Sequence, residues 1–95
     1  MKKKSILNVK IGQVIRKRRK KQGMTIEKLA EESRVNEKHL GEIERGLITI
    51  TLPTLLKIEK GFGYEKPGTI SNDEEILELY ENLFTYVDDN DKNEK

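Results

Sequence analysis

Residues 24–46 read MTIEKLAEESRVNEKHLGEIERG, and this stretch decides the fold. It predicts two short helices that meet at a tight turn, one over about 26–33 and one over about 37–45. Thr25 and Asn36 precede the two helices. Both are typical N-cap residues, because their side-chain oxygens accept hydrogen bonds from free backbone N–H groups.

The apolar residues of this stretch fall on one side of each predicted helix, which anchors both helices to a core. They are Leu29, Ala30, Val35, Leu40 and Ile43. Gly46 ends the second helix, since glycine adopts the left-handed conformation without a Cβ clash. The outer face of that helix presents Glu37, Lys38 and Glu42, with His39 at its edge. A short helix that is anchored underneath and polar outside fits a DNA major groove.

Related patterns continue outside the two helices: IGQVIRKRR at 11–19, LA at 29–30, IERG at 43–46 and TLLKI at 54–58. With them, residues 11–62 resemble the phage-repressor and Cro type of helix-turn-helix protein, the lambda repressor-like or XRE family. The resemblance implies an all-α fold, a compact five-helix bundle with the helix-turn-helix at helices 2–3. ITL at 50–52, followed by TLLKI, also resembles the controller proteins of restriction–modification systems, over fewer residues.

The resemblance implies DNA contacts from the second motif helix and its surroundings. We expect Lys38 to donate to guanine O6 or N7 and Glu37 to accept from cytosine N4, unless Glu37 instead serves the helix dipole. His39 is expected at a phosphate or sugar, and Glu42 either reads a base or repels the wrong one. The remaining expected DNA contacts are Thr25, Ile26 through its backbone N–H, Asn36, Arg45 and Thr49, with Thr25, Arg45 and Thr49 assigned to phosphates.

The same resemblance gives three structural expectations. The residues at the positions of Arg19 and Glu44 form an ion pair in the family, and such a pair fixes helix geometry more than it adds stability. The family often has Gln where this chain has Ile26, and Gly where it has Arg34. A left-handed Arg34 would be strained by about 1–2 kcal/mol, so the turn is either remodelled or strained.

The 95 residues suffice for one domain, and the charge is distributed unevenly along them. Residues 1–26 contain ten Lys and Arg and no acid, whereas 73–95 contain nine acids and two lysines. The basic end suits a polyanion, and the acidic end is expected to face away from it. Arg16–Lys21 are six consecutive cations, which surround a helix, so most of them are expected in solvent.

Four parts are predicted along the chain. They are a basic flexible arm (1–8), a helix-turn-helix DNA-binding domain (9–63), a loop with a C-terminal helix (64–87) and a disordered tail (88–95). The arm is either a solvated terminus or a contact to DNA phosphates or a minor groove.

Outside the motif, helices are predicted over about 9–22, 52–62 and 72–87. In the first of them, Ile11 and Ile15 are expected to be buried, and Gly12 allows close approach to a neighbouring helix. After Gly46, Leu47 and Ile50 are expected to fill the core beneath the second motif helix. The alternative for this apolar loop is that Ile48 is exposed to a partner or a thymine methyl.

The last predicted helix has more apolar surface than a small domain covers. Ile76, Tyr80, Leu83, Phe84 and Val87 are therefore predicted at or near a two-fold dimer interface. Such an axis would set two copies of the second motif helix about 34 Å apart, the repeat of one DNA turn. The alternative is that the last helix folds back onto its own domain.

The residue types argue against several functions. The chain has no cysteine, His39 is its single histidine, and no catalytic set, phosphate loop or metal-ligand spacing is evident. No apolar run reaches the length of a membrane span or a signal-peptide core. We therefore expect no enzyme activity, no cofactor, no metal, no membrane insertion and a cytoplasmic location.

These observations predict a transcriptional regulator that binds double-stranded DNA sequence-specifically, at a palindromic operator, as a homodimer, with helix 3 in the major groove. One alternative is a helix-turn-helix protein-interaction module, an antitoxin or bridging factor that acts mainly through a protein partner. Another is nonspecific binding to polyanions or a membrane surface through residues 1–21.

Overall fold

The computed structural model describes residues 3–84 and 86–88, which form a helical bundle with one small sheet. The α-helices are α1 (Ile6–Lys21), α2 (Ile26–Ser33), α3 (Glu37–Glu44), α4 (Leu52–Gly61) and α5 (Glu74–Leu77). A 3₁₀ helix, η1 (Tyr80–Asn82), and two strands, β1 (Lys3–Ser5) and β2 (Tyr86–Asp88), complete the described elements. The predicted all-α, five-helix bundle is confirmed, with two short strands in addition.

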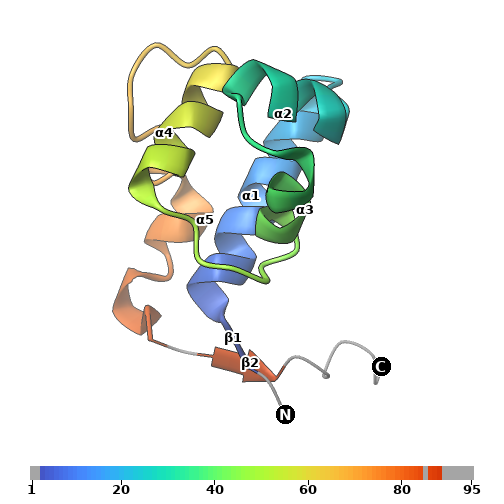
Figure 1. Ribbon diagram of the computed structural model, residues 1–95. Coiled ribbons are helices and arrows are strands. Elements are labelled where there is room, and N and C mark those ends of the chain that lie inside the picture. Colours follow the sequence, from blue (N-terminus) through green and yellow to red (C-terminus); the bar gives the residue numbers. More distant parts are fainter. Residues whose placement is uncertain (1–2, 85, 89–95) are drawn as a thin grey trace.

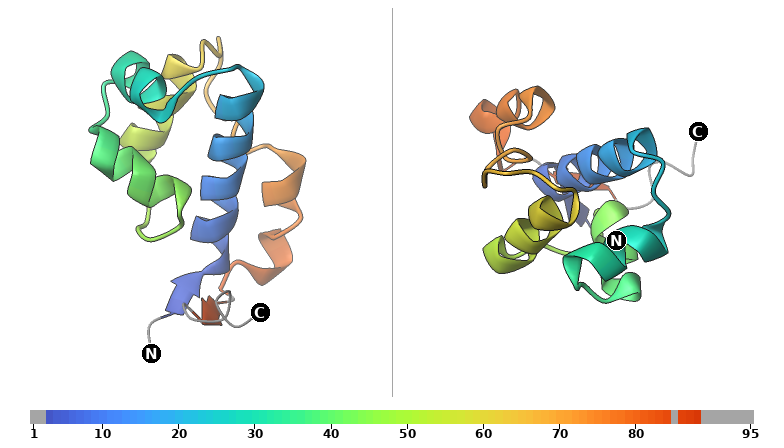
Figure 2. Two further views of the ribbon diagram at one scale, coloured as in Figure 1. Left: turned by 90° about the vertical axis from the view of Figure 1, so that its right-hand side faces the viewer. Right: turned by 90° about the horizontal axis from the view of Figure 1, so that it is seen from above.

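The long helix α1 lies at the centre of the bundle (Figure 1). It packs against α3 and against α5, while α2 contacts both α3 and α4. Figure 2 shows α2, α3 and α4 together on one side of α1, with α5 on the other side. The helix-turn-helix formed by α2 and α3 is therefore separated from α5 by α1.

Side-chain caps begin both helices of the motif, as the sequence indicated. The Thr25 hydroxyl accepts from the backbone N of Lys28 at 3.0 Å, and Asn36 Oδ1 accepts from the backbone N of His39 at 3.0 Å. Arg34 ends α2 in the left-handed conformation with φ 58°. The turn is therefore strained rather than remodelled.

The core lies between α1 and the helix-turn-helix and continues toward α4 and α5. Leu29, Ala30, Leu40, Ile43 and Ile15 are buried, and Val35 and Ile11 pack against them, as predicted. Gly12 lies where α1 crosses α3, because a Cβ there would fall 2.3 Å from the carbonyl oxygen of Ile43. This confirms the predicted close approach of α1 to a neighbouring helix.

The predicted start of the first helix is wrong by three residues. The helix begins at Ile6, because the Ser5 hydroxyl accepts from the backbone N of Leu7 and of Asn8 and so caps it. Residues 3–5 do not form a flexible arm, since β1 pairs with β2 in an antiparallel register. Residues 1–2 of the predicted arm and 89–95 of the predicted tail lie outside the described residues.

The single C-terminal helix predicted over about 72–87 is also wrong. The α-helical part ends at Leu77 and is followed by η1 and then β2. Asp73 caps the start of α5 by accepting from the backbone N of Glu75 at 2.8 Å, and Ile76 is its buried residue. A helix depends on packing of its apolar face, and within the described residues Leu77, Tyr80 and Phe84 are left exposed.

The apolar loop after α3 differs from its prediction at one position. Leu47 is 48% exposed and does not fill the core, whereas Ile48 and Ile50 pack against it. Leu52 and Leu56 on α4 are exposed as well. The chain turns outward at Leu47 because Gly46, with φ 73°, reverses its direction at the end of α3.

A buried carboxylate fixes the loop between α4 and α5. Glu59 is 2% exposed, and its two oxygens accept from the backbone N of Gly68 at 3.0 Å and of Ile70 at 2.8 Å. Ile70 is itself fully buried. These hydrogen bonds, which no sequence pattern indicated, tie the loop to α4 and so set where α5 begins.

Candidate nucleic-acid interface

Two shallow hollows adjoin each other where α2 and α3 begin. One, of about 540 Å³, is lined by Ile26, Asn36, Glu37, Lys38, Gly41 and Arg45. The other, of about 380 Å³, is lined by Arg16, Arg19, Thr25, Ile26, Gly41, Glu44 and Arg45. They share Ile26, Gly41 and Arg45, so they form one continuous concave surface along α2 and α3.

The structure brings six of the nine predicted DNA-contacting residues together on this surface. They are Thr25, Ile26, Asn36, Glu37, Lys38 and Arg45. His39 and Thr49 are exposed and Glu42 is half-buried, but none of these three lines either hollow. The oxygens of Thr25 and Asn36 are already engaged as helix caps, so their first role is to hold the starts of α2 and α3 in place.

Arg16 belongs to this surface, although it was not among the residues predicted from the sequence. It is exposed and lines the hollow with Thr25, Ile26 and Arg45. The signal that could have found it was spacing: Arg16 lies three residues before Arg19, on the same face of α1. An arginine on that face points toward the N-terminus of α2, where backbone N–H groups and the helix dipole favour an anion.

The predicted ion pair between Arg19 and Glu44 is present beneath this surface. Arg19 Nε donates to Glu44 Oε2 at 2.7 Å, and a second guanidinium nitrogen donates to Oε1 at 3.0 Å. Arg19 also donates to the backbone oxygen of Met24 at 2.9 Å. The hydrogen bond to Glu44 raises the pKa of Arg19, so the guanidinium stays charged. The pair joins α1, the chain before α2 and the end of α3.

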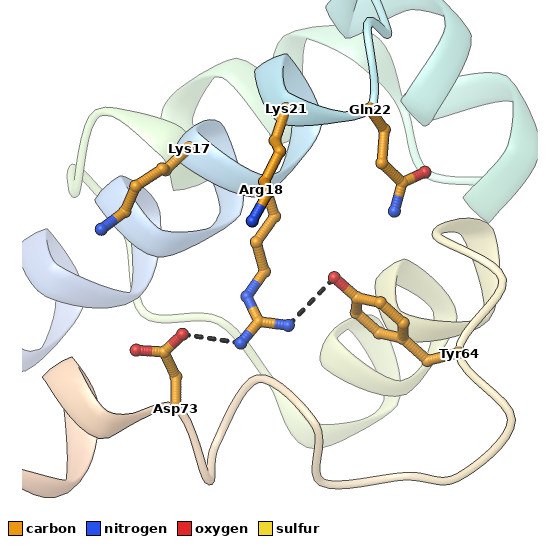
Figure 3. A pocket seen from close by; sticks show the side chains of 6 residues that line it. All are labelled: Lys17, Arg18, Lys21, Gln22, Tyr64 and Asp73. Carbon is orange, nitrogen blue, oxygen red and sulfur yellow. Dashed lines mark hydrogen bonds and ion pairs between the residues drawn. The ribbon is translucent and has the colours of Figure 1, made fainter.

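Lys17, Arg18 and Lys21 of α1 line a separate hollow together with Tyr64 and Asp73 (Figure 3). One guanidinium nitrogen of Arg18 donates to Asp73 Oδ2 at 2.6 Å, the other donates to the Tyr64 hydroxyl at 3.0 Å, and the guanidinium carbon lies 5.4 Å from the Tyr64 ring centroid. The hydrogen bond from Arg18 lowers the pKa of Asp73. Lys17 and Lys10 both pair with Glu75. Arg18, like Arg19, is thus held in a partly buried ion pair, whereas residues 16, 17, 20 and 21 of the run are exposed, as expected for most of it.

The residues predicted for the dimer interface differ in how exposed they are. Ile76 is 8% exposed and belongs to the core, so it is not accessible to a second copy. Tyr80 and Phe84 are 72% and 87% exposed, while Leu83 is half-buried. Val87 lies in β2, opposite Lys4 of β1. Leu77 and Tyr86, which were not predicted there, are also exposed.

Comparison with known families identifies the class of protein. The helix-turn-helix family model HTH_3 matches residues 15–68, and the chain therefore belongs to this family. Its fold is that of XRE-type DNA-binding transcription regulators, as the sequence resemblance implied.

Among solved structures, the chain is similar to restriction-modification controller proteins. C.AhdI from Aeromonas hydrophila is 33% identical over 61% of this chain and 88% of that chain, with a TM-score of 0.59. C.Esp1396I is 31% identical over 78% of this chain and 91% of that chain, with a TM-score of 0.67. The clp gene regulator ClgR from C. glutamicum is 33% identical over 60% of this chain and 74% of that chain, with a TM-score of 0.58. No curated protein sequence matches the chain.

Two further observations concern the described part of the chain. None of its helices is long and apolar enough to cross a membrane. Within residues 3–84 and 86–88, His, Asp and Glu side chains form no group of three or more that is able to hold a metal ion.

Proposed function

We propose that the protein is a transcriptional regulator that binds a palindromic DNA operator as a homodimer, with α3 in the major groove. The observation that carries the proposal is the concave surface at the starts of α2 and α3. There Arg45 lies beside the exposed Glu37 and Lys38, and Arg16 lines the adjoining hollow that shares Arg45. Cations next to a helix N-terminus attract phosphates, and polar side chains on the outer face of α3 are able to reach base edges.

The residues of this surface have two kinds of role in the proposal. Lys38 donates to guanine O6 or N7, and Glu37 accepts from cytosine N4. Arg16, Arg45 and the backbone N–H of Ile26 hold phosphates and so set the position of α3 in the groove. Ile26 replaces a side-chain donor found in many relatives, and the neighbouring arginines compensate for the missing hydrogen bond.

Thr49 and Asn36 extend these contacts along the duplex. Thr49 is exposed in the loop after α3. Asn36 starts α3 and lines the larger hollow. His39 and Glu42 lie farther along α3. His39 contacts a sugar or a phosphate, and Glu42 contacts the edge of a base.

Dimerisation is proposed through the C-terminal segment after α5. Tyr80 and Phe84 are large apolar side chains that the single chain leaves in solvent, and burying them against a second copy is favourable. Since α5 packs on the opposite side of α1 from α3, both copies keep their DNA-facing surfaces free. The same exposed residues would serve a protein partner in the alternative function.

The homodimer is tested by sedimentation of two matched variants at micromolar concentration. Phe84→Asp should convert the dimer to a folded monomer, whereas Leu52→Asp, which charges another exposed apolar site, on α4, should leave it dimeric. The reverse result would place the interface on α4. A wild-type chain that stays monomeric and captures no DNA, but binds a separate protein, would favour the interaction-module function.

Sequence-specific binding is tested first by selection of bound duplexes from random DNA. The selected duplex is then titrated with Lys38→Ala and with Lys57→Ala, a control that removes an exposed lysine on α4 away from the concave surface. Lys38→Ala should lose roughly 1–3 kcal/mol and relax the preference at one base pair of each half-site. Equal losses on all sequences would make Lys38 a phosphate contact, and failure to select any sequence would refute the proposed function.

A further inference from the structure

The first and last described segments of the chain meet in a two-stranded ribbon. Strands β1 and β2 pair antiparallel, with Lys3 opposite Asp88, Lys4 opposite Val87 and Ser5 opposite Tyr86. They come together at one end of α1, at the bottom of the view in Figure 1. The ribbon therefore joins the basic start of the protein to the segment proposed for dimerisation.

The β1 strand lies against the end of α3. Lys4 Nζ donates to the backbone oxygen of Arg45 at 3.3 Å, and Asn8 Nδ2 donates to the Thr49 hydroxyl at 3.0 Å. Behind it the two chain segments touch, since a Cβ on Gly46 would fall 2.8 Å from the Cα of Val9. Lys4 is thus held next to Arg45, and Asn8 of α1 next to Thr49; Arg45 and Thr49 are the proposed phosphate contacts after α3.

Three residues of strand pairing do not hold such a ribbon by themselves, because isolated two-stranded ribbons are marginal in water. The position of β2 depends on the segment before it, and that segment is anchored to α1. Ile76 is buried in the core, and Lys17 pairs with Glu75. Arg18 donates to Asp73 (Figure 3). Through these contacts α1 fixes α5, and α5 limits where β2 is able to pair.

We propose that β1 is a second DNA-contacting element and that β2 is the positioning element that holds it. In this arrangement Lys4 binds a phosphate of the operator strand that passes the end of α3. The inference rests on the proposed function, because it requires α3 to lie in the major groove. Holding β1 in place before DNA arrives removes part of the ordering cost that a free terminus would incur on binding.

The proposal assigns a DNA-binding role to residues that do not touch DNA. It also links dimerisation to affinity, since Tyr80 and Phe84 lie between the anchored α5 and the strand β2. A second copy that covers these side chains would steady β2 and thereby Lys4.

The test compares two full-length variants with the same net charge as the natural chain. In Tyr86→Pro/Val87→Pro, prolines occupy two adjacent positions of β2. Because hydrogen-bonded and non-hydrogen-bonded pairs alternate along an antiparallel ladder, one of the two prolines must remove a backbone N–H that donates to β1. In the control, Tyr86→Thr/Val87→Thr, the same side chains are removed but the residues remain strand-compatible. Each is also made in a Lys4→Ala background, and affinity for the selected duplex is measured across a series of salt concentrations.

The proline variant should bind more weakly than the threonine control, with a shallower dependence of log affinity on log salt. The slope should fall by about 0.9 for the one phosphate that Lys4 no longer neutralises. In the Lys4→Ala background, proline and threonine variants should bind alike. Hydrogen exchange of the free proteins should show that the amides of residues 3–5 lose protection only in the proline variant.

Three results would overturn the inference, each in a different way. Equal slopes for the proline and threonine variants, with amide protection reduced, would show that β2 does not position β1. An unchanged slope after Lys4→Ala would show that β1 does not contact DNA through this lysine. Weaker binding by the proline variant that persists in the Lys4→Ala background would assign the effect to dimerisation. All three leave sequence-specific binding by α3 intact, whereas failure of the proposed function would remove it in every variant.

Discussion

Two glycines in helix interiors should respond in opposite ways when each is replaced by alanine. Gly12 lies in α1 and Gly41 in α3. A Cβ on Gly12 would fall 2.3 Å from the Ile43 carbonyl oxygen and 2.6 Å from that of Glu44, both backbone atoms that belong to α3. A Cβ on Gly41 would meet only the flexible ends of Arg45, at 3.3 Å, and Ile26, at 3.7 Å. The two substitutions therefore share their chemistry and differ in their surroundings.

The magnitudes follow from two opposing effects. Alanine stabilises a helix interior by about 1 kcal/mol relative to glycine. Overpacking costs about 1–3 kcal/mol, and the upper part of that range applies to Gly12 because main-chain atoms, not a side-chain tip, must move. Gly12→Ala should therefore lower the free energy of unfolding by about 2 kcal/mol, while Gly41→Ala should raise it by up to about 1 kcal/mol.

Thermal melts followed by circular dichroism distinguish the two variants. For a domain of this size the expected shift is a fall in Tm of about 8–16 °C for Gly12→Ala and a rise of about 4–8 °C for Gly41→Ala. Urea denaturation at 25 °C supplies the free energies directly. If Gly12→Ala proves as stable as Gly41→Ala, α1 and α3 do not approach each other as closely as described. If both variants lose stability equally, the loss does not come from the close approach.

Two other changes test the strained turn and the anchor of the C-terminal segment. Arg34→Gly should stabilise the protein by up to about 1 kcal/mol, because it relieves a left-handed non-glycine residue but gives the unfolded chain more freedom. A variant less stable than the natural chain in urea denaturation would mean that Arg34 makes a compensating contact. Since the pKa of Asp73 is lowered in the folded state, its ion pair with Arg18 stabilises the fold above the ordinary carboxyl pKa, and that stability is lost as pH falls through the folded value. Unfolding free energies measured from pH 6 down to pH 2 should therefore drop further for the natural chain than for Asp73→Asn, and parallel curves would contradict the assignment.

The helix-turn-helix was predictable because its determinants are local. Thr25 and Asn36 cap the residues three positions after them, and Leu29, Ala30, Leu40 and Ile43 follow the helical period. None of these signals needs knowledge of distant parts of the chain. The pair of Arg19 and Glu44 is not local, and it was predictable only because a family resemblance supplied it.

The C-terminal segment shows what such signals omit. Apolar residues after Asp73 have helical spacing, but spacing alone does not say whether anything covers them. In the structure Ile76 has a place in the core and Tyr80 and Phe84 do not, and the helix ends between them. The pairing of Lys3–Ser5 with Tyr86–Asp88 joins residues about 80 positions apart, and three residues on each side are too few to produce a recognisable strand pattern.

The distribution of charge explains how one short basic helix serves two surfaces. The uneven charge led to the expectation that the basic end meets a polyanion and the acidic end faces away from that polyanion, and within the chain Asp73 and Glu75 bind Arg18 and Lys17 directly. Both observations hold together because six consecutive cations surround α1. Arg16 and Arg19 point toward the helix-turn-helix, and the side facing α5 is neutralised. The run therefore keeps Arg16 exposed beside the start of α2, where it is able to attract a phosphate, while Lys17 and Arg18 hold α5 in place.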